Sequence, residues 1–467
     1  MIRVKIRKIF FATLMIAIAV FAIYPYDTGI FAAESGVNPV AASQSSDVRE
    51  SGGFFSLARC IEIALARNPE IAAAQWDIAA ANSRLDAARA AFWPQVSTEG
   101  GYQRYVDSQR LIAARYNGEV GVFDNDLLRG DLVVRWPLFT GWRITSEADA
   151  AGKLSEAEKK KFIRTRDELI YSVTSVYFSI LGQQKIVAAL EFSKGALEES
   201  RKRVAQLYDV QKVAKVDLLR TEVRLTDLKQ NFIKEENTLA VQERLLFSLM
   251  GLDVVPEKAV FDEKLEPTEA PIDLARLIET ALKNCPDYQA AKDRTEAQAL
   301  RVKAAKAGYW PTVSLVGAYG VRNAPSSEDM GKNTKSTEDI GSIGGVVTVP
   351  LFDAGLINAK VREETANLAA SRERLKKLEL QIRQETETAA LGVQSNAARI
   401  KATEKAIEQA KESFRIESLK YDLARGSITD VLDAQSAQLQ AETAYYRALI
   451  DYHTSMARLR LATGGNI

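Results

Sequence analysis

Two long stretches of the chain contain no proline and almost no glycine. They run from Gly141 to Val210 and from Leu356 to Ala424. Proline breaks helices, so each stretch predicts one helix about 100 Å long, whereas globular helices average about 12 residues. Leu368, Leu375 and Ile382 recur every seven residues, which is typical of a coiled-coil seam. After a short break a further helix of about 35 residues follows each stretch, which predicts two antiparallel hairpins.

The chain repeats itself. "LARCIEIALARNPE" at 57–70 aligns without gaps on "LARLIETALKNCPD" at 274–287. From "PLF" at 137–139 and at 350–352 onward the two copies align again, with a slightly shorter spacing between them. The chain is therefore interpreted as two tandem copies of a unit of about 200 residues, a period too long for a solenoid. The predicted organisation is a first repeat over 55–251, a linker over 252–272 and a second repeat over 273–467.

Each copy contains a junction from helix to strand. "FWPQVS" at 92–97 and "YWPTVS" at 309–314 carry the Trp-Pro pair at which the preceding helix must end, because proline disfavours helical geometry in the residue before it. Residues with period-two alternation follow, apolar on one face and small or polar on the other, as in strands of membrane barrels. Alternation alone leaves a soluble amphipathic hairpin equally open. The predicted strands are 95–106, 130–139, 312–322 and 341–352, and the hairpin tips lie near 211–214 and 425–427.

The N-terminus resembles a secretory signal. Basic residues precede an apolar run from Ile9 to Ile23, which is short for a bilayer span of about 20 residues. A signal peptide over 1–33 and a flexible leader over 34–54 are predicted, with an uncleaved anchor as the alternative. Lys plus Arg total 62 and Asp plus Glu total 61, so no basic excess indicates a nucleic-acid partner.

In this order, the motifs resemble those of the TolC-type outer-membrane efflux proteins. The matching pieces cover about 55–467 and include "LARCIEIALARNPE", "FWPQVS", "PLFTGW" and "GSITDVLDAQ" with their counterparts in the other copy. The resemblance implies a homotrimer in which each chain gives four strands to a 12-stranded barrel in the outer membrane lipid, while the helices form a periplasmic tunnel. It implies a passive exit duct of a tripartite efflux or type I secretion system in a Gram-negative bacterium. The expected partners are a periplasmic adaptor protein and an inner-membrane transporter.

The resemblance also assigns roles at the second tip. It places Asp430 and Asp433 on one helix face at the periplasmic constriction, where three chains would bring up to six carboxylates together and favour cations. For Asp430 a simple acid at a helix start is equally open. Asp217 matches Asp430 in the first copy, and Tyr421 and Arg425 are candidates for contacts that close the tip. The usual turn glycine of the family is replaced by Ala424.

The remaining residues singled out from the sequence are four tryptophans, the two cysteines and the single histidine. Trp93, Trp310, Trp136 and Trp142 lie at the predicted strand ends and are expected to form an aromatic girdle at the membrane interface, with a soluble core cluster as the alternative. Cys60 and Cys285 are expected to be buried thiols, although a disulfide stays open, and His453, the only histidine, is expected to be a surface or packing residue.

With so few cysteines and histidines, neither a metal site nor a nucleophile pair is expected, so no cofactor and no enzyme activity are predicted. The alternative to a channel is an exported coiled-coil structural protein or adhesin without a pore.

Overall fold

The structure is a computed structural model. It describes residues 54–113, 121–253, 256, 259–261, 265–266, 273–324, 337–423 and 425–465. The chain divides into two units, Met1–Gly52 and Gly53–Ile467, and every described element belongs to the second. The predicted signal peptide, nearly all of the leader, most of the linker and the position of Ala424 lie outside the described residues.

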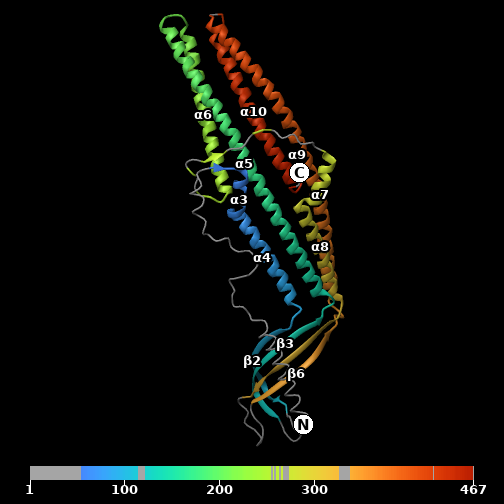
Figure 1. Cartoon of the computed structure of the whole chain (residues 1–467). Coiled ribbons are helices and arrows are strands. Elements are labelled where there is room, and N and C mark those ends of the chain that lie inside the picture. Colours follow the sequence, from blue (N-terminus) through green and yellow to red (C-terminus); the bar gives the residue numbers. More distant parts are fainter. Residues whose placement is uncertain are drawn as a thin grey trace. The chain divides into compact units, whose positions relative to one another are not determined.

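One order of elements, two helices, two strands and two helices, occurs twice in this unit (Figure 1). The first set is α3 (Leu57–Arg67), α4 (Pro69–Ala90), β2 (Gln95–Ile112), β3 (Val122–Phe139), α5 (Arg143–Asp209) and α6 (Lys215–Leu249). The second set is α7 (Leu274–Asn284), α8 (Pro286–Lys306), β5 (Thr312–Asn323), β6 (Thr337–Thr348), α9 (Leu356–Asp422) and α10 (Ile428–Ala462), with a short 3-10 turn, η1 (Ala307–Tyr309), after α8. Two dipeptide strands, β1 (Phe54–Phe55) and β4 (Val260–Phe261), pair in parallel.

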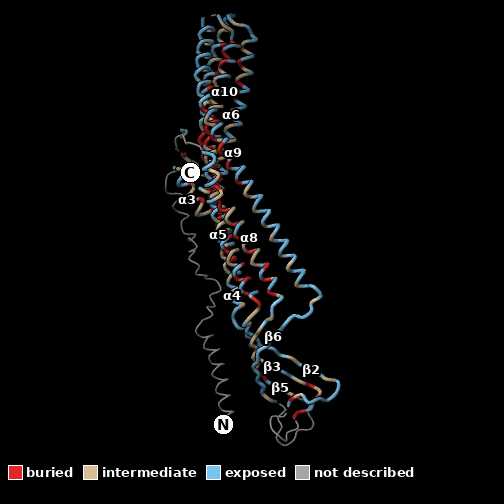
Figure 2. Tube along the Cα trace, turned by 90° about the vertical axis from the view of Figure 1, so that its right-hand side faces the viewer, coloured by how far each residue is buried: buried red, intermediate tan, exposed pale blue. Residues whose placement is uncertain are grey.

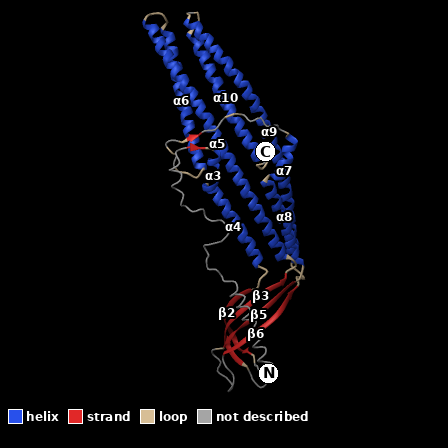
Figure 3. Cartoon of the chain, in the orientation of Figure 1, coloured by secondary structure: helices blue, strands red, loops and turns tan. Residues whose placement is uncertain are grey.

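The long helices have the lengths that their proline-free sequences predict. Both α5 and α9 contain 67 residues, and both α6 and α10 contain 35. The described chain is mainly helical, as predicted, and the helices lie apart from the sheet (Figure 3). Ile382 of the predicted seam is buried, and Leu368 and Leu375 are half-buried.

Helix starts follow the local chemistry. The Asn68 side chain accepts the backbone N–H of Glu70 at 2.8 Å and donates to the carbonyl of Leu249 at 2.8 Å, while Pro69 takes the first helical position. Cys285, its counterpart, caps α8 without a side-chain hydrogen bond. Asparagine is a strong N-cap because its oxygen satisfies a helix-terminal N–H.

A turn of two left-handed residues connects each hairpin of strands to its long helix. Gly141 and Trp142 have φ of 63° and 66°, and Ala354 and Gly355 have φ of 54° and 85°. Each turn thus has one glycine and one strained L-residue, in opposite order.

The large sheet has the order β2-β3-β5-β6, and all of its pairs are antiparallel. Three strand ranges differ from the predictions by more than one residue, and β5 ends one residue later than predicted. In the first hairpin β2 ends later, at Ile112, and β3 begins earlier, at Val122. The polar residues in these extensions obscure the alternation in the sequence, but they are paired across the two strands. One example is the hydrogen bond from the Tyr102 hydroxyl to Asp126 (2.6 Å). The last strand starts at Thr337 and ends at Thr348, before Pro350, which has no N–H for a ladder.

Helix α5 is the centre of the packing, since it contacts α3, α4, α6, α8 and α10. The buried residues gather along these helices, whereas most strand residues are exposed (Figure 2). The largest buried cluster surrounds Tyr177, whose hydroxyl donates to the carbonyl of Phe55 at 2.9 Å. No helix among the described residues is long and apolar enough to cross a membrane.

Candidate functional site

The tips are the two turns that connect α5 to α6 and α9 to α10. Both lie at the end of the helices that is remote from the sheet (Figure 1). In the first turn Gln211 has a left-handed φ of 58°. In the second, the side chain of Ser427 accepts the backbone N–H of Thr429 at 3.1 Å. These turns bring the starts of α6 and α10 to the same end of the molecule, where the predicted tip residues lie.

Asp430 acts at the start of α10. Its carboxylate accepts the backbone N–H of Ser427 at 3.4 Å and so completes a capping box. This is the helix-start role that the sequence left open for it. The residue is exposed, so the cap does not remove its charge from solvent.

Asp433 is engaged by an arginine of the other hairpin. The Arg224 guanidinium on α6 donates to its carboxylate at 3.0 Å, and Arg220 donates to the hydroxyl of Thr429 at 3.0 Å. Arg220 also lies 4.0 Å from the carboxylate of Asp217. Arg224 is a tip residue that the sequence prediction misses. Its position one helical turn after Arg220 could have revealed it, since residues at that spacing share a helix face.

Tyr421 lies half-buried near the start of α6. Its hydroxyl is inaccessible to solvent and has no hydrogen-bond partner among the described residues. Burial raises the pKa of Tyr421, and the carboxylates of Asp217 and Asp422 raise it further. Arg203 on α5 adds an ion pair to Asp422 at 3.5 Å. Arg425 is exposed and has no ion pair within the described part of the chain, so its role at the tip stays a prediction.

A groove of about 380 Å³ runs between α6 and α10 at the tip. Arg220, Arg224 and Asp433 line it together with the exposed apolar side chains of Val216, Leu219 and Val223. The predicted tip residues therefore border a surface that combines paired charges with uncovered apolar groups.

The four tryptophans lie at the junction between helices and sheet. Trp142 and Trp310 form an edge-to-face pair with ring centroids 5.5 Å apart, and Trp136 donates its indole N–H to the carbonyl of Phe92 at 2.9 Å. All four, including Trp93 at 64%, are exposed. In this chain they are not a buried core cluster.

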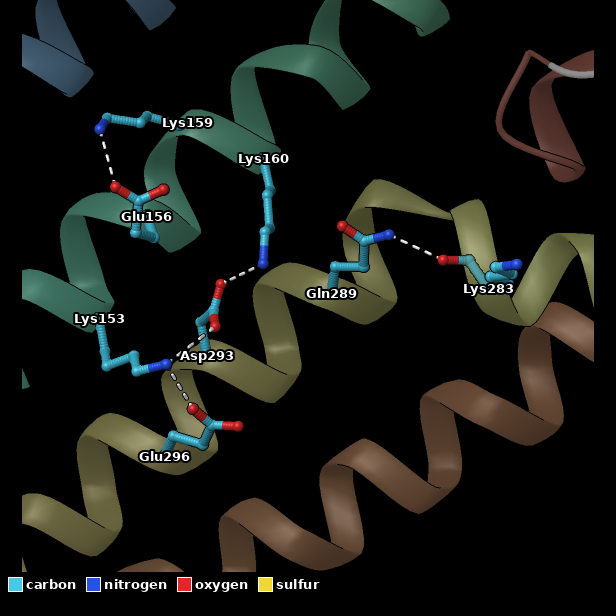
Figure 4. A network of polar contacts seen from close by, with 8 residues as sticks. All are labelled: Lys153, Glu156, Lys159, Lys160, Lys283, Gln289, Asp293 and Glu296. Carbon is cyan, nitrogen blue, oxygen red and sulfur yellow. Dashed lines mark hydrogen bonds and ion pairs between the residues drawn. The ribbon is translucent and has the colours of Figure 1, made fainter.

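An ion-pair network joins α5 to α8 (Figure 4). The buried carboxylate of Asp293 lies between Lys153 and Lys160, at 4.0 Å and 2.5 Å, and Lys153 also pairs with Glu296 at 2.7 Å. One carboxylate thus holds two turns of α5 against the second repeat.

The remaining candidates are structural. Cys60 and Cys285 are free, buried thiols, so a disulfide between them is excluded. His453 is a packing residue, stacked on Phe178 with centroids 4.1 Å apart. No group of three or more potential metal ligands occurs within the described ranges.

Comparison with known protein families shows to which family the chain belongs. A model described as outer membrane efflux protein matches residues 60–252 and again 277–465. The chain belongs to this family. It is 21% identical to the outer membrane protein TolC of Escherichia coli (strain K12), over 88% of this chain and 84% of that one. The proteases secretion protein PrtF of Dickeya chrysanthemi is 23% identical over 76% of each chain.

Solved structures show the same fold. The outer membrane protein VceC of Vibrio cholerae superimposes with a TM-score of 0.73 at 19% identity, covering 88% of this chain and 96% of that one. The outer-membrane channel OprN gives a TM-score of 0.72 at 21% identity, covering 88% and 90%. The family, the outer-membrane location and the exit-duct function predicted from sequence are confirmed, and the adhesin alternative is set aside. Proteins of this family are channels rather than enzymes.

Proposed function

We propose that three copies of this outer membrane efflux protein assemble into a channel-tunnel whose 12-stranded barrel lies in outer membrane lipid. The observation that carries this proposal is the four-stranded sheet, whose outer strands β2 and β6 each pair on one side only within the described residues. Unpaired strand edges cannot lie in hydrocarbon, and closure into a barrel removes them. Further copies of the same sheet supply the missing neighbours.

The two faces of the sheet support this arrangement. One face carries exposed apolar side chains, among them Val96, Leu132, Trp136 and Val347. The opposite face carries two ion pairs, Arg135 with Glu99 at 2.7 Å and Arg322 with Asp131. A third pair, Arg104 with Asp126 at 3.9 Å, lies on the apolar face, farther along the first hairpin from the helices. Apolar side chains suit a lipid surface and charged pairs suit a water-filled interior. The tryptophans at the sheet end would then form the interfacial girdle.

At the other end, the contacts between hairpins are proposed to hold the tunnel tip closed. Arg224 to Asp433, Arg220 to Thr429 and Arg203 to Asp422 each join the α5–α6 hairpin to the α9–α10 hairpin. A periplasmic adaptor protein, driven by an inner-membrane transporter, would bind the tip surfaces around Lys212–Lys215 and Arg425–Thr429 and separate the hairpins. Tyr421 would add to closure by packing against the start of α6.

The tip carboxylates are proposed to set ion preference at the constriction. Asp430 is exposed and is held only by its cap, whereas the carboxylate of Asp433 is paired with Arg224. Asp217, half-buried beside Arg220, would contribute less. Three exposed Asp430 carboxylates, one from each chain, would attract multivalent cations by their combined field.

Two measurements test this function. The mass of the complex extracted in mild detergent should equal three chains, and a monomer would contradict the assembly. In planar bilayers the wild type should conduct and should be blocked by multivalent cations. Asp430→Ala combined with Asp433→Ala should weaken that block, while Glu408→Ala, on the exposed face of α9, controls for the loss of a carboxylate elsewhere on the surface. Equal block in all three proteins would contradict the acidic constriction.

A further inference from the structure

Inside one chain, α5 of the first repeat and α8 of the second are antiparallel neighbours. Lys153 pairs with Glu296 (2.7 Å), Lys160 with Asp293, and Arg164 with Asp287 (3.0 Å). Residue numbers rise along α5 as they fall along α8, so these contacts define a register. Figure 4 shows the two lysine contacts.

The sequence repeat relates α5 to α9 and α8 to α4. The face of α4 that carries Glu70 and Trp76 is exposed, with Trp76 at 73%. The face of α9 that carries Ala366, Glu373 and Lys377 is exposed as well. A tryptophan left in water on a helix is costly, whereas buried tryptophans anchor protein interfaces.

Each residue in the α5–α8 contact has an aligned counterpart in the other copy, on α9 or α4. If α9 and α4 pack in the same register, these counterparts form specific residue pairs. The ion pair of Arg164 with Asp287 becomes Lys377 with Glu70, which again have opposite charges at the same positions. About four turns further along both helices, the same register sets Glu363 opposite Arg84. Within the described part of the chain none of these last four residues has an ion-pair partner.

The size of the side chains changes in a compensating way. Lys153 and Asp293, which lie 4.0 Å apart, become Ala366 and Trp76, while Lys160, the nearer partner of Asp293, becomes Glu373. The pair of Lys153 with Asp293 combines a long cationic side chain with a short carboxylate. The pair of Ala366 with Trp76 combines one of the smallest side chains with the largest. Trp76 precedes Trp93 by about 25 Å along the helix, so it is outside the proposed membrane girdle and lipid does not cover it.

We propose that the exposed face of α4 docks on α9 of a second copy of this chain, with Trp76 lying over Ala366 and Glu70 paired with Lys377. The proposal rests on the proposed trimer and identifies the contact that closes it. Each chain offers one α4 face and one α9 face, so the contact runs head to tail and closes a ring of copies.

Cross-linking in intact outer membranes tests the register. The full chain carries Cys60→Ala and Cys285→Ala, to which Glu70→Cys and Lys377→Cys are added, and a short bismaleimide is applied. Denaturing gels should show covalent products of two and three chains. The control pairs Glu70→Cys with Glu363→Cys, about 21 Å from position 377 along α9, and should give far less product. A complex with the mass of three chains in which both pairs cross-link equally would overturn this contact and leave the channel intact, whereas the absence of a trimer would overturn the proposed assembly.

A reciprocal exchange tests the size compensation. Trp76→Asp should lower the temperature at which the trimer dissociates, and addition of Ala366→Lys should restore most of the loss by recreating the lysine–aspartate pair of α5 and α8. A double variant no more stable than Trp76→Asp alone would contradict the proposed contact of these two positions.

Discussion

His453 should make the protein less stable as the pH falls from about 7 to about 5. The ring is stacked on Phe178, and its Nε2 atom is inaccessible and has no hydrogen-bond partner among the described residues. Burial lowers the pKa of His453 to about 4. The unfolded chain, with a histidine pKa of about 6.5, binds a proton over this range that the folded protein does not bind, so folding loses free energy.

The magnitude follows from the two pKa values. At about pH 5 the unfolded state is almost fully protonated at this position and the folded state is not, which corresponds to a loss of about 2 kcal/mol relative to pH 7. Because the ring is only partly shielded from solvent, we expect about 1 to 2 kcal/mol. The effect should be absent above about pH 7, where both states are neutral.

Other groups act in the opposite direction. Burial raises the pKa of Asp167, Glu243 and Asp287, so these carboxylates bind protons more readily in the folded protein and stabilise it as the pH falls. The experiment therefore compares the wild type with His453→Phe, which keeps a stacked ring but cannot titrate. The carboxylates are common to both proteins, so they cancel in the difference.

The assay is urea unfolding of the detergent-solubilised protein, followed by circular dichroism at several pH values. The wild type should lose stability relative to His453→Phe between about pH 6.5 and pH 5. Parallel curves for the two proteins over this range would refute the assigned burial of the imidazole.

Three further substitutions test the packing, the tip and the turn. A Cβ atom on Gly182 would overlap Cγ1 of Ile450, so Gly182→Ala should destabilise the α5–α10 contact by about 1 to 3 kcal/mol. Adding Ile450→Ala should relieve that clash in thermal melts, and no relief would exclude it. Arg224→Ala and Asp433→Ala should each raise single-channel conductance, and the double variant should equal either one, because both remove the same ion pair; additive increases would mean that the two residues act separately. Ala354→Gly, at a φ of 54°, should raise the unfolding free energy by about 1 kcal/mol, and an unchanged urea midpoint would show that the turn is not strained.

The parts of this fold that depend on local chemistry can be predicted from the sequence. The absence of proline predicts α5 and α9, and Asn68 with Pro69 predicts the start of α4. The alternating sequence pattern underestimates the length of the two strands in the first hairpin. A polar residue such as Asp126 is typical of a loop, and only the sheet shows that it pairs with Tyr102.

The tip can be located from sequence, but its pairs cannot. Asp430 is recognisable as a capping acid because the cap forms within one short segment of chain. The partner of Asp433 is far away in sequence, and only the packing of α6 beside α10 brings Arg224 to it. Long-range pairs of this kind depend on tertiary structure and leave no periodic signal in the sequence.

The divergence between the two copies explains how a duplicated unit can bind itself. Both copies retain an acid at the start of the returning helix, Asp217 and Asp430, because each acid serves its own helix. Three residues later the copies differ, with Arg220 in one and Asp433 in the other. Two identical copies would place two aspartates in the groove between α6 and α10, where like charges repel. With arginine at position 220 that residue instead donates to Thr429, and Arg224 pairs with Asp433. Restoring the symmetry with Arg220→Asp and Arg224→Ala should therefore separate the hairpins at the tip and raise the conductance more than loss of Asp433 alone.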